Sequence, residues 1–336
     1  MKYAACFALF AACAVVNAEP AGSYNRREWM SKYVRPASIP YPDDNRYTQE
    51  REDLGRTLFF DPRLSNTGSM SCASCHNPGF SYGDGLPRAI GEGQKVLGRR
   101  TPTILNLAWA ELLFWDGRAA SLEEQALGPI AAAGEMNLSL DRMVKTVAGI
   151  PGYRPLFEKA YPGEPMNEKT VARAIATFER TVISGTAPFD RWIAGDESSI
   201  SEAAKRGFDL FNTKAACAKC HTGWNFTDHG FHDIGVPGDN RGRGVHLPKL
   251  EAMQYAFKTP TLRNARERAP FLHDGSEATL NDVIDFYDKG GRVKRPSLSP
   301  DVAELRLTMQ DKQDLMEFLR TLSSTDKPMA VPVMPR

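Results

Sequence analysis

Cys72-Ala73-Ser74-Cys75-His76 is the stretch that decides the fold of this 336-residue chain. Cys-x-x-Cys-His is the attachment motif of c-type haem, in which two thiols bond the porphyrin and the adjacent histidine binds the iron. Two intervening residues allow a single helical turn to present both sulfurs to one porphyrin edge. The same motif recurs at Cys217-Ala218-Lys219-Cys220-His221. The repetition favours two covalently attached haems over a zinc site or a redox pair of cysteines.

The remaining composition narrows the class of protein. Cys6 and Cys13 lie near the N-terminus, so the rest of the chain has no cysteine left for a structural disulfide. Lysine and arginine total 42 against 41 acidic residues, and this balance argues against a nucleic-acid partner or a polybasic membrane-binding surface. The length is sufficient for two domains of ordinary size.

Residues 1–18 have the pattern of a signal peptide. Lys2 supplies the positive charge, an apolar run extends from Ala4 to Val16, and Val16-Asn17-Ala18 offers a small-residue cleavage site. The apolar run is shorter than a helix that spans a bilayer, which argues against a membrane anchor. The residues before Cys13 match a lipid-attachment signal poorly. We therefore expect export to the periplasm, where bacterial c-type haem is attached, of a protein with no membrane span.

The order of the chain predicts an N-terminal arm and two similar domains. Residues 19–45 lack periodicity and predict an extended arm. Helical spacing of apolar residues precedes each haem motif, and the spacing of Gly55, Leu58 and Phe59 recurs at Gly207, Leu210 and Phe211. This repeat indicates two cytochrome c-like domains, at 46–196 and 197–336. The glycines allow either close backbone approach or a tolerated helix flaw.

The expected fold class is all-α, with short helices and long loops around two haems. Besides the helices that lead to the motifs, we expect helices at about 103–111, 122–127, 167–183, 280–288 and 310–321.

Several runs of sequence resemble the bacterial di-haem cytochrome c peroxidase/MauG family, and within it the MauG-like subgroup. They span the chain after the leader in the family's order: Leu58-Phe59-Phe60-Asp61-Pro62-Arg63-Leu64-Ser65, Phe114-Trp115-Asp116-Gly117-Arg118-Ala119, Leu122-Glu123-Glu124-Gln125-Ala126, Thr259-Pro260-Thr261-Leu262-Arg263-Asn264 and Ala269-Pro270-Phe271-Leu272-His273-Asp274-Gly275. The resemblance implies an enzyme that uses hydrogen peroxide and carries two covalently bound haems c.

The resemblance also implies that the haem on His76 is open. Peroxidases of the family have a distal histidine in an Ile-Gly-His-Gly loop, but this chain has Ile90-Gly91-Glu92-Gly93 and no other histidine between His76 and His221. Glu92 could bind iron, although a solvated loop carboxylate is favoured because carboxylates rarely ligate haem. We expect this haem to react with peroxide without prior reduction.

An open haem needs a group that moves the peroxide proton. By resemblance, Glu135 is the proton carrier, Gln125 is its hydrogen-bonding neighbour and Pro129 is a steric wall. Without the family register, Glu135 would be an ordinary surface acid.

The second haem, on His221, takes Tyr287 as its other iron ligand by resemblance, where the peroxidases have methionine. Sequence alone would make Tyr287 a core aromatic residue. Trp115 corresponds to the tryptophan that carries electrons between the haems, and it also suits a structural core position. The family holds a calcium ion through residues that correspond to Arg100, Arg268 and Pro270. Arg100 stands where the peroxidases have an asparagine, so a side-chain ligand is lost. The resemblance therefore does not decide whether this protein binds Ca²⁺.

MauG has a surface tryptophan two residues before the second motif, and this chain has Ala215 there. Either another aromatic residue such as Trp224 serves in its place, or the electron donor is different. The remaining histidines are expected to be hydrogen-bond partners rather than iron ligands: His229, His232, His246 and His273.

Three functions compete. The first is a periplasmic, MauG-like enzyme that uses peroxide to oxidise a partner protein. The second is a cytochrome c peroxidase that removes peroxide with electrons from a small cytochrome or copper protein. The third is a di-haem electron carrier without enzymatic activity, which would need a second strong ligand for the iron on His76. The sequence leaves both a monomer and a homodimer open.

Overall fold

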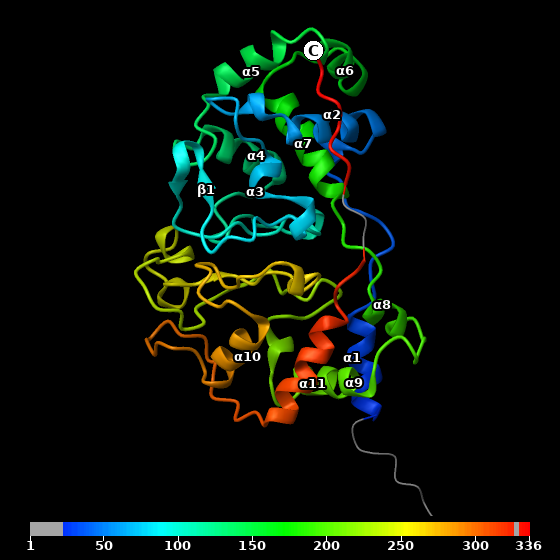
Figure 1. Cartoon of the computed structure of the whole chain (residues 1–336), viewed down its shortest axis with the longest axis vertical. Coiled ribbons are helices and arrows are strands. Elements are labelled where there is room, and N and C mark those ends of the chain that lie inside the picture. The colour runs from blue at the N-terminus through cyan, green and yellow to red at the C-terminus, as the bar shows by residue number, and fades with distance from the viewer. Residues whose placement is uncertain (1–22, 326–328) are drawn as a thin grey trace, which may run out of the picture.

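The computed structural model describes residues 23–325 and 329–336, so the expected signal peptide lies outside the described residues. Figure 1 shows two helical domains stacked along the long axis, with long loops meeting between them. Among the described residues, none of the helices combines the length and the apolar character needed to cross a membrane.

The first domain consists mainly of helices around the first haem motif. They are α2 (Gln49–Phe60), α3 (Cys72–Cys75), α4 (Leu122–Ala131), α5 (Leu140–Ala148), α6 (Tyr153–Ala160) and α7 (Glu168–Thr181). Strands β1 (Ile90–Gly91) and β2 (Lys95–Val96) form a small antiparallel pair, with Ile90 opposite Val96.

The second domain follows the same plan. Its helices are α8 (Pro188–Ile193), α9 (Glu202–Asn212), α10 (Leu280–Asp288) and α11 (Met309–Arg320). Strands β3 (Phe231–His232) and β4 (Phe257–Lys258) pair antiparallel. Short 3-10 helices lie at Asp43–Asn45, Pro62–Leu64, Pro78–Phe80, Glu92–Gln94, Leu107–Trp109, Cys217–Lys219, Arg243–Val245, Glu251–Met253 and Ala265–Glu267.

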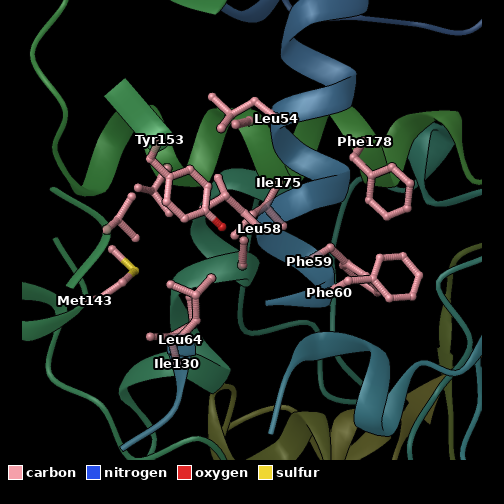
Figure 2. Close-up of a cluster of buried hydrophobic side chains, with 14 of the residues drawn as sticks. Leu54, Leu58, Phe59, Phe60, Leu64, Ile130, Met143, Tyr153, Ile175 and Phe178 are labelled. Atoms are coloured by element: carbon pink, nitrogen blue, oxygen red, sulfur yellow. The ribbon is translucent and has the colours of Figure 1, made fainter. Parts of the chain in front are cut away.

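One pair of crossing helices organises each domain, and a glycine makes each crossing possible. A Cβ on Gly55 of α2 would lie 1.9 Å from the carbonyl oxygen of Ala174 in α7. A Cβ on Gly207 of α9 would lie 2.0 Å from the carbonyl oxygen of Asp314 in α11. The repeated glycine therefore serves close backbone approach. Around α2, Figure 2 shows the apolar side chains of the first core, among them Leu58, Phe59, Ile175 and Phe178.

Local sequence signals account for the ends of these helices. The side chain of Thr48 accepts a hydrogen bond from Arg51 N at 3.2 Å, and that of Ser201 accepts one from Ala204 N at 3.1 Å. Such N-caps satisfy backbone donors that a helix leaves free at its start. The helix expected at 103–111 forms only a 3-10 turn, because Asn106 adopts a left-handed conformation with φ of 62°. Helices α5 and α6 were not expected.

The first and last segments of the described residues pack across the division that we expected between residues 196 and 197. Residues 23–32 form helix α1 (Ser23–Lys32) instead of an extended arm, and this helix packs on the second domain. Trp29 contacts Phe208 with ring centroids 6.4 Å apart, and this contact buries apolar surface that an extended arm would expose. At the other end, Gly152 N of the first domain donates to Arg336 O at 2.9 Å.

Candidate haem-binding and peroxide site

A cavity of about 710 Å³ lies where the two domains meet, and both haem motifs contribute to its wall. The first motif supplies Cys75 and His76, while the second supplies Cys217, Cys220 and His221. Its volume falls within the range of binding sites that enclose a cofactor. The four cysteines of the motifs form no disulfide bonds, so their sulfurs fit covalent haem attachment. Burial raises the pKa of the Cys75 thiol to about 11.

Each proximal histidine is held by a backbone carbonyl in the loop that follows it. Nδ1 of His76 lies 3.2 Å from Tyr82 O, and Nδ1 of His221 lies 2.9 Å from Phe226 O. Tyr82 and Phe226 have left-handed backbones with φ of 61° and 52°. A hydrogen bond at Nδ1 fixes the ring and leaves Nε2 for iron. Burial lowers the pKa of both histidines, which favours the neutral imidazole that binds metal.

Gln125, Pro129 and Glu135 line the same cavity as His76. Gln125 and Pro129 lie one turn apart on α4, and the buried Oε1 of Gln125 has no hydrogen-bond partner. Burial raises the pKa of Glu135, while the positive charge of Arg118 acts in the opposite direction. The structure therefore brings together the three residues that the resemblance assigned to the peroxide side of the first haem.

The loop that could have supplied another iron ligand packs behind Glu135. Glu92 N donates to Glu135 O at 2.8 Å, and a Cβ on Gly91 would lie only 1.8 Å from Gly134 O. The Glu92 carboxylate accepts a hydrogen bond from Thr67 N at 2.6 Å. Hydrogen bonding by the Thr67 side chain, with this backbone bond as a smaller contribution, lowers the pKa of Glu92. Because Glu92 does not line the cavity, it is a loop carboxylate and not a candidate iron ligand.

Tyr287 of α10 lines the cavity together with His221. It is the eighth residue of α10, and Pro129 is the eighth residue of α4. The two helices follow equivalent loops in the two domains, so Pro129 holds in the first domain the place of Tyr287 in the second. Proline has no side-chain donor atom for iron, whereas the phenol of Tyr287 has one. Burial raises the pKa of this phenol.

Trp115 joins the domains at the cavity wall. Its Nε1 donates to Arg100 O at 2.9 Å, and its own carbonyl accepts from Lys258 N of β4 at 2.8 Å. The side chain is 8% exposed. The first bond fixes the indole and the second fixes the backbone of Trp115, in the wall of the cavity that both haem motifs line.

Five lysine and arginine residues line the cavity wall, and two of them, Arg99 and Arg118, pair with Asp116. The other three favour an anionic cofactor: Arg100, Lys258 and Arg268. In the described part of the chain, none of the three forms an ion pair with a carboxylate. Burial lowers the pKa of Lys258 to about 8 and that of Arg268 to about 9. Haem propionates would supply the missing negative charge, so the residues fit two haems. The sequence reasoning missed Lys258, although it precedes Thr259-Pro260 as Arg100 precedes Thr101-Pro102.

The remaining histidines make contacts within the second domain and at its boundary. His232 Nε2 lies 2.7 Å from Asp228, His246 Nε2 lies 3.5 Å from Asp116, and His273 stacks on Phe257. The buried Nδ1 of His229 has no partner. Cys220, Asp228 and His232 place possible metal-binding atoms within 4.8 Å of one another, but the Cys220 sulfur belongs to the haem motif.

The two positions considered for contact with a partner protein differ in exposure. Ala215 is buried in the second core. Trp224 is partly exposed and packs edge-on against Trp109 of the first domain, with ring centroids 4.7 Å apart. The Arg35 guanidinium lies 5.4 Å from the centroid of the Trp224 ring.

Comparisons with known proteins agree with this geometry. The family model for di-haem cytochrome c peroxidase matches residues 49–198, and the model for cytochrome c matches residues 204–323. The chain is 50% identical to the methylamine utilization protein MauG of Methylorubrum extorquens over 308 residues, which cover 91% of this chain and 87% of the relative. It is 31% identical to the cytochrome c551 peroxidase of Pseudomonas aeruginosa, over 86% of this chain and 83% of the relative.

A solved structure extends the likeness to three dimensions. The crystal structure of a MauG-like protein associated with microbial copper homeostasis superposes with a TM-score of 0.80 at 33% identity, covering 88% of this chain and 94% of that one. The expected all-α fold of two cytochrome c-like domains is confirmed. The two haem motifs, the helical fold and the relatives lead to one conclusion: this chain belongs to the di-haem cytochrome c peroxidase and MauG family of haem c oxidoreductases.

Proposed function

We propose that this enzyme works in the periplasm, reacts with hydrogen peroxide beside Gln125, Pro129 and Glu135, and oxidises a partner protein. The observation that carries the proposal is the difference between Pro129 and Tyr287 at equivalent positions of α4 and α10. In the first domain, the Pro129 side chain has no atom that could bind iron. In the second domain, Tyr287 offers a phenol oxygen. The bound haems supply peroxide activation and hold the oxidising equivalents.

The side chains that line the cavity near His76 act on the peroxide. The Glu135 carboxylate would accept the proton of one peroxide oxygen and give it to the other, which leaves as water when the O–O bond breaks. The two electrons that this cleavage consumes would come from the bound haems. The free Oε1 of Gln125 accepts a hydrogen bond in the same space. Pro129 keeps the iron-facing space free of protein donors. General acid–base assistance of this kind contributes about 10²–10⁴-fold to a rate.

The part of the cavity around His221 and Tyr287, together with the domain boundary, serves electron transfer. Tyr287 would hold the second haem iron as a phenolate, a ligand that would stabilise the oxidised metal. Trp115 carries electrons between the two domains. Its indole is held at the boundary by the bond to Arg100 O, and its backbone carbonyl is held by Lys258 N. Trp224, partly exposed three residues after His221, is our candidate contact for the partner protein.

The proposal that the enzyme oxidises a partner protein is based on its resemblance to MauG, which is described as a methylamine utilization protein. Ala215 supports a second candidate, in which the enzyme removes peroxide with electrons from a small cytochrome or copper protein. Being buried, Ala215 offers no aromatic contact to a substrate protein. Membership of an enzyme family argues against the third function considered, a pure electron carrier.

Electron paramagnetic resonance of the oxidised holoprotein tests the proposal. We expect one high-spin and one low-spin ferric signal, and a reaction with peroxide that needs no prior reduction. Two low-spin signals would contradict an open first haem. Steady-state turnover with reduced cytochrome c and peroxide then separates the two enzymatic roles, since rapid turnover favours peroxide removal. Fractionation of cells tests the periplasmic location.

A further inference from the structure

Two cationic side chains reach across the domain boundary in a reciprocal arrangement. Arg100 Nη2 of the first domain donates to Arg268 O of the second at 2.6 Å. Lys258 Nζ of the second domain donates to Leu112 O of the first at 2.6 Å. Arg100 and Lys258 stand at equivalent places, each directly before a Thr-Pro pair. Hydrogen bonds from the cationic side chains of Arg100 and Lys258 therefore link the two domains.

The Arg100 side chain lies where the family resemblance expects calcium. Of the three residues assigned to that ion, Arg100 already uses its carbonyl to accept the Trp115 indole, at 2.9 Å. The carbonyl of Arg268 accepts the Arg100 guanidinium. An asparagine side chain would present an acceptor oxygen here, whereas a guanidinium carries only donors.

The charges at this place oppose a divalent cation. Arg100 and Arg268 are each 6% exposed, and the charge of Arg100 acts on the Arg268 guanidinium. Calcium takes six to eight oxygen ligands, usually with carboxylates among them. Asp84 is the acid whose charge reaches Arg100, and its carboxylate accepts a hydrogen bond from Thr101 Oγ1 at 2.6 Å. The residues present therefore do not fit a calcium ion.

We propose that the guanidinium of Arg100 replaces calcium as the cation between the two domains, so that the protein holds its haems and Trp115 in place without a metal ion at the boundary. Arg100 is a positioning residue in this proposal: its side chain binds the second domain and its carbonyl holds the indole. The Nε of Arg100, which is buried without a partner, remains available to an anionic group of a bound haem.

Calcium analysis of the wild-type holoprotein is the first test. We expect far less than one calcium per chain by elemental analysis after extensive dialysis. Treatment with a calcium chelator should leave the haem resonance signals and the melting temperature unchanged. About one calcium per chain, with signals that change on chelation and recover on adding calcium, would overturn the proposal.

Replacing the side chain is the second test. The variant Arg100→Asn removes the charge and supplies an acceptor, so it should gain about one bound calcium per chain. Added calcium should then raise its melting temperature by about 2–4 °C. Arg88→Asn is the matched control, because Arg88 is exposed and its guanidinium donates to Gly98 O at 3.2 Å. An Arg100→Asn protein that ignores calcium overturns the assignment to Arg100.

The wild-type chelation measurement decides the question even if Arg100→Asn fails to fold. Neither test uses peroxide or turnover, so failure of the proposed function would leave both results interpretable.

Discussion

Trp115 and His273 face each other across the domain boundary, with ring centroids 6.5 Å apart and ring planes at 68°. They occupy equivalent positions in two copies of one loop, in which Phe114 and Leu272 have matching left-handed φ angles of 66° and 65°. Lys258 N donates to Trp115 O, and Arg100 N donates to His273 O at 2.9 Å. The boundary thus has approximate two-fold symmetry, and equivalent positions of the two loops carry different side chains.

The equivalence of Pro129 and Tyr287 predicts that Pro129→His closes the first pocket. Histidine at this place on α4 would hold the position that Tyr287 holds on α10, where we propose that Tyr287 would bind the second iron. We expect the high-spin ferric signal to become low-spin and the reaction with peroxide to slow by about 10²-fold or more, because a strong sixth ligand blocks the open position. Pro129→Ala is the control and should stay high-spin. A Pro129→His protein that stays high-spin would refute the equivalence.

The proposed role of Glu135 predicts a specific pH dependence. The base form of this carboxylate is lost as the pH falls through its pKa, which burial raises above the ordinary 4.5. The wild-type peroxide reaction should therefore slow in mildly acidic solution. Glu135→Gln should be about 10²–10⁴-fold slower and should lack this acidic limb. Stopped-flow absorption across the pH range measures both effects.

Glu92→Gln is the matched control for that measurement. Glu92 lies on the adjoining loop but outside the cavity. Its replacement should leave the pH profile of the peroxide reaction unchanged. If both variants altered the profile equally, Glu135 would have no special role as proton carrier.

The helix crossing at Gly207 predicts a strong effect of one methyl group. A Cβ there would lie 2.0 Å from Asp314 O and 2.7 Å from the Cβ of Phe318, so α9 and α11 must move apart. We expect Gly207→Ala to lose about 1–3 kcal/mol of stability, visible as a lower melting temperature. Gly98→Ala is the control, since nothing lies within 4 Å of a Cβ at Gly98. Equal melting temperatures for the two variants would contradict the packing.

Glu179 of α7 predicts a pH-dependent stability. It is 3% exposed, and burial raises its pKa from 4.5 to about 8. Between these values the unfolded chain is ionised at this residue while the folded protein keeps the proton. Stability therefore falls as the pH rises through that window.

Replacing Glu179 by glutamine should remove this slope. We expect Glu179→Gln to melt close to the wild type near the acidic end of the window and to be about 1–3 kcal/mol more stable at the alkaline end. Thermal melts across the window measure the difference, and Glu158→Gln on the exposed face of α6 is the control. A wild-type slope retained in Glu179→Gln would show that another group causes it.

Much of this protein is determined by short stretches of sequence. The two haem motifs predict which thiols attach the porphyrins and which histidines bind the irons, because this prediction depends only on the spacing within each motif. The helix expected at about 280–288 agrees with α10, because helical spacing of apolar residues is a local signal. The structure adds an N-cap at Thr279. Gln125, Pro129 and Glu135 were found from family register and not from periodicity.

Tertiary structure alone decided how these pieces are joined. It placed α1 on the second domain and the last residues on the first, because these contacts link segments far apart in the chain. It turned the Glu92 carboxylate towards Thr67, and it directed the Arg100 guanidinium to a carbonyl of the other domain. The residue type alone determines the charge of a side chain, but long-range packing determines which partner that side chain contacts.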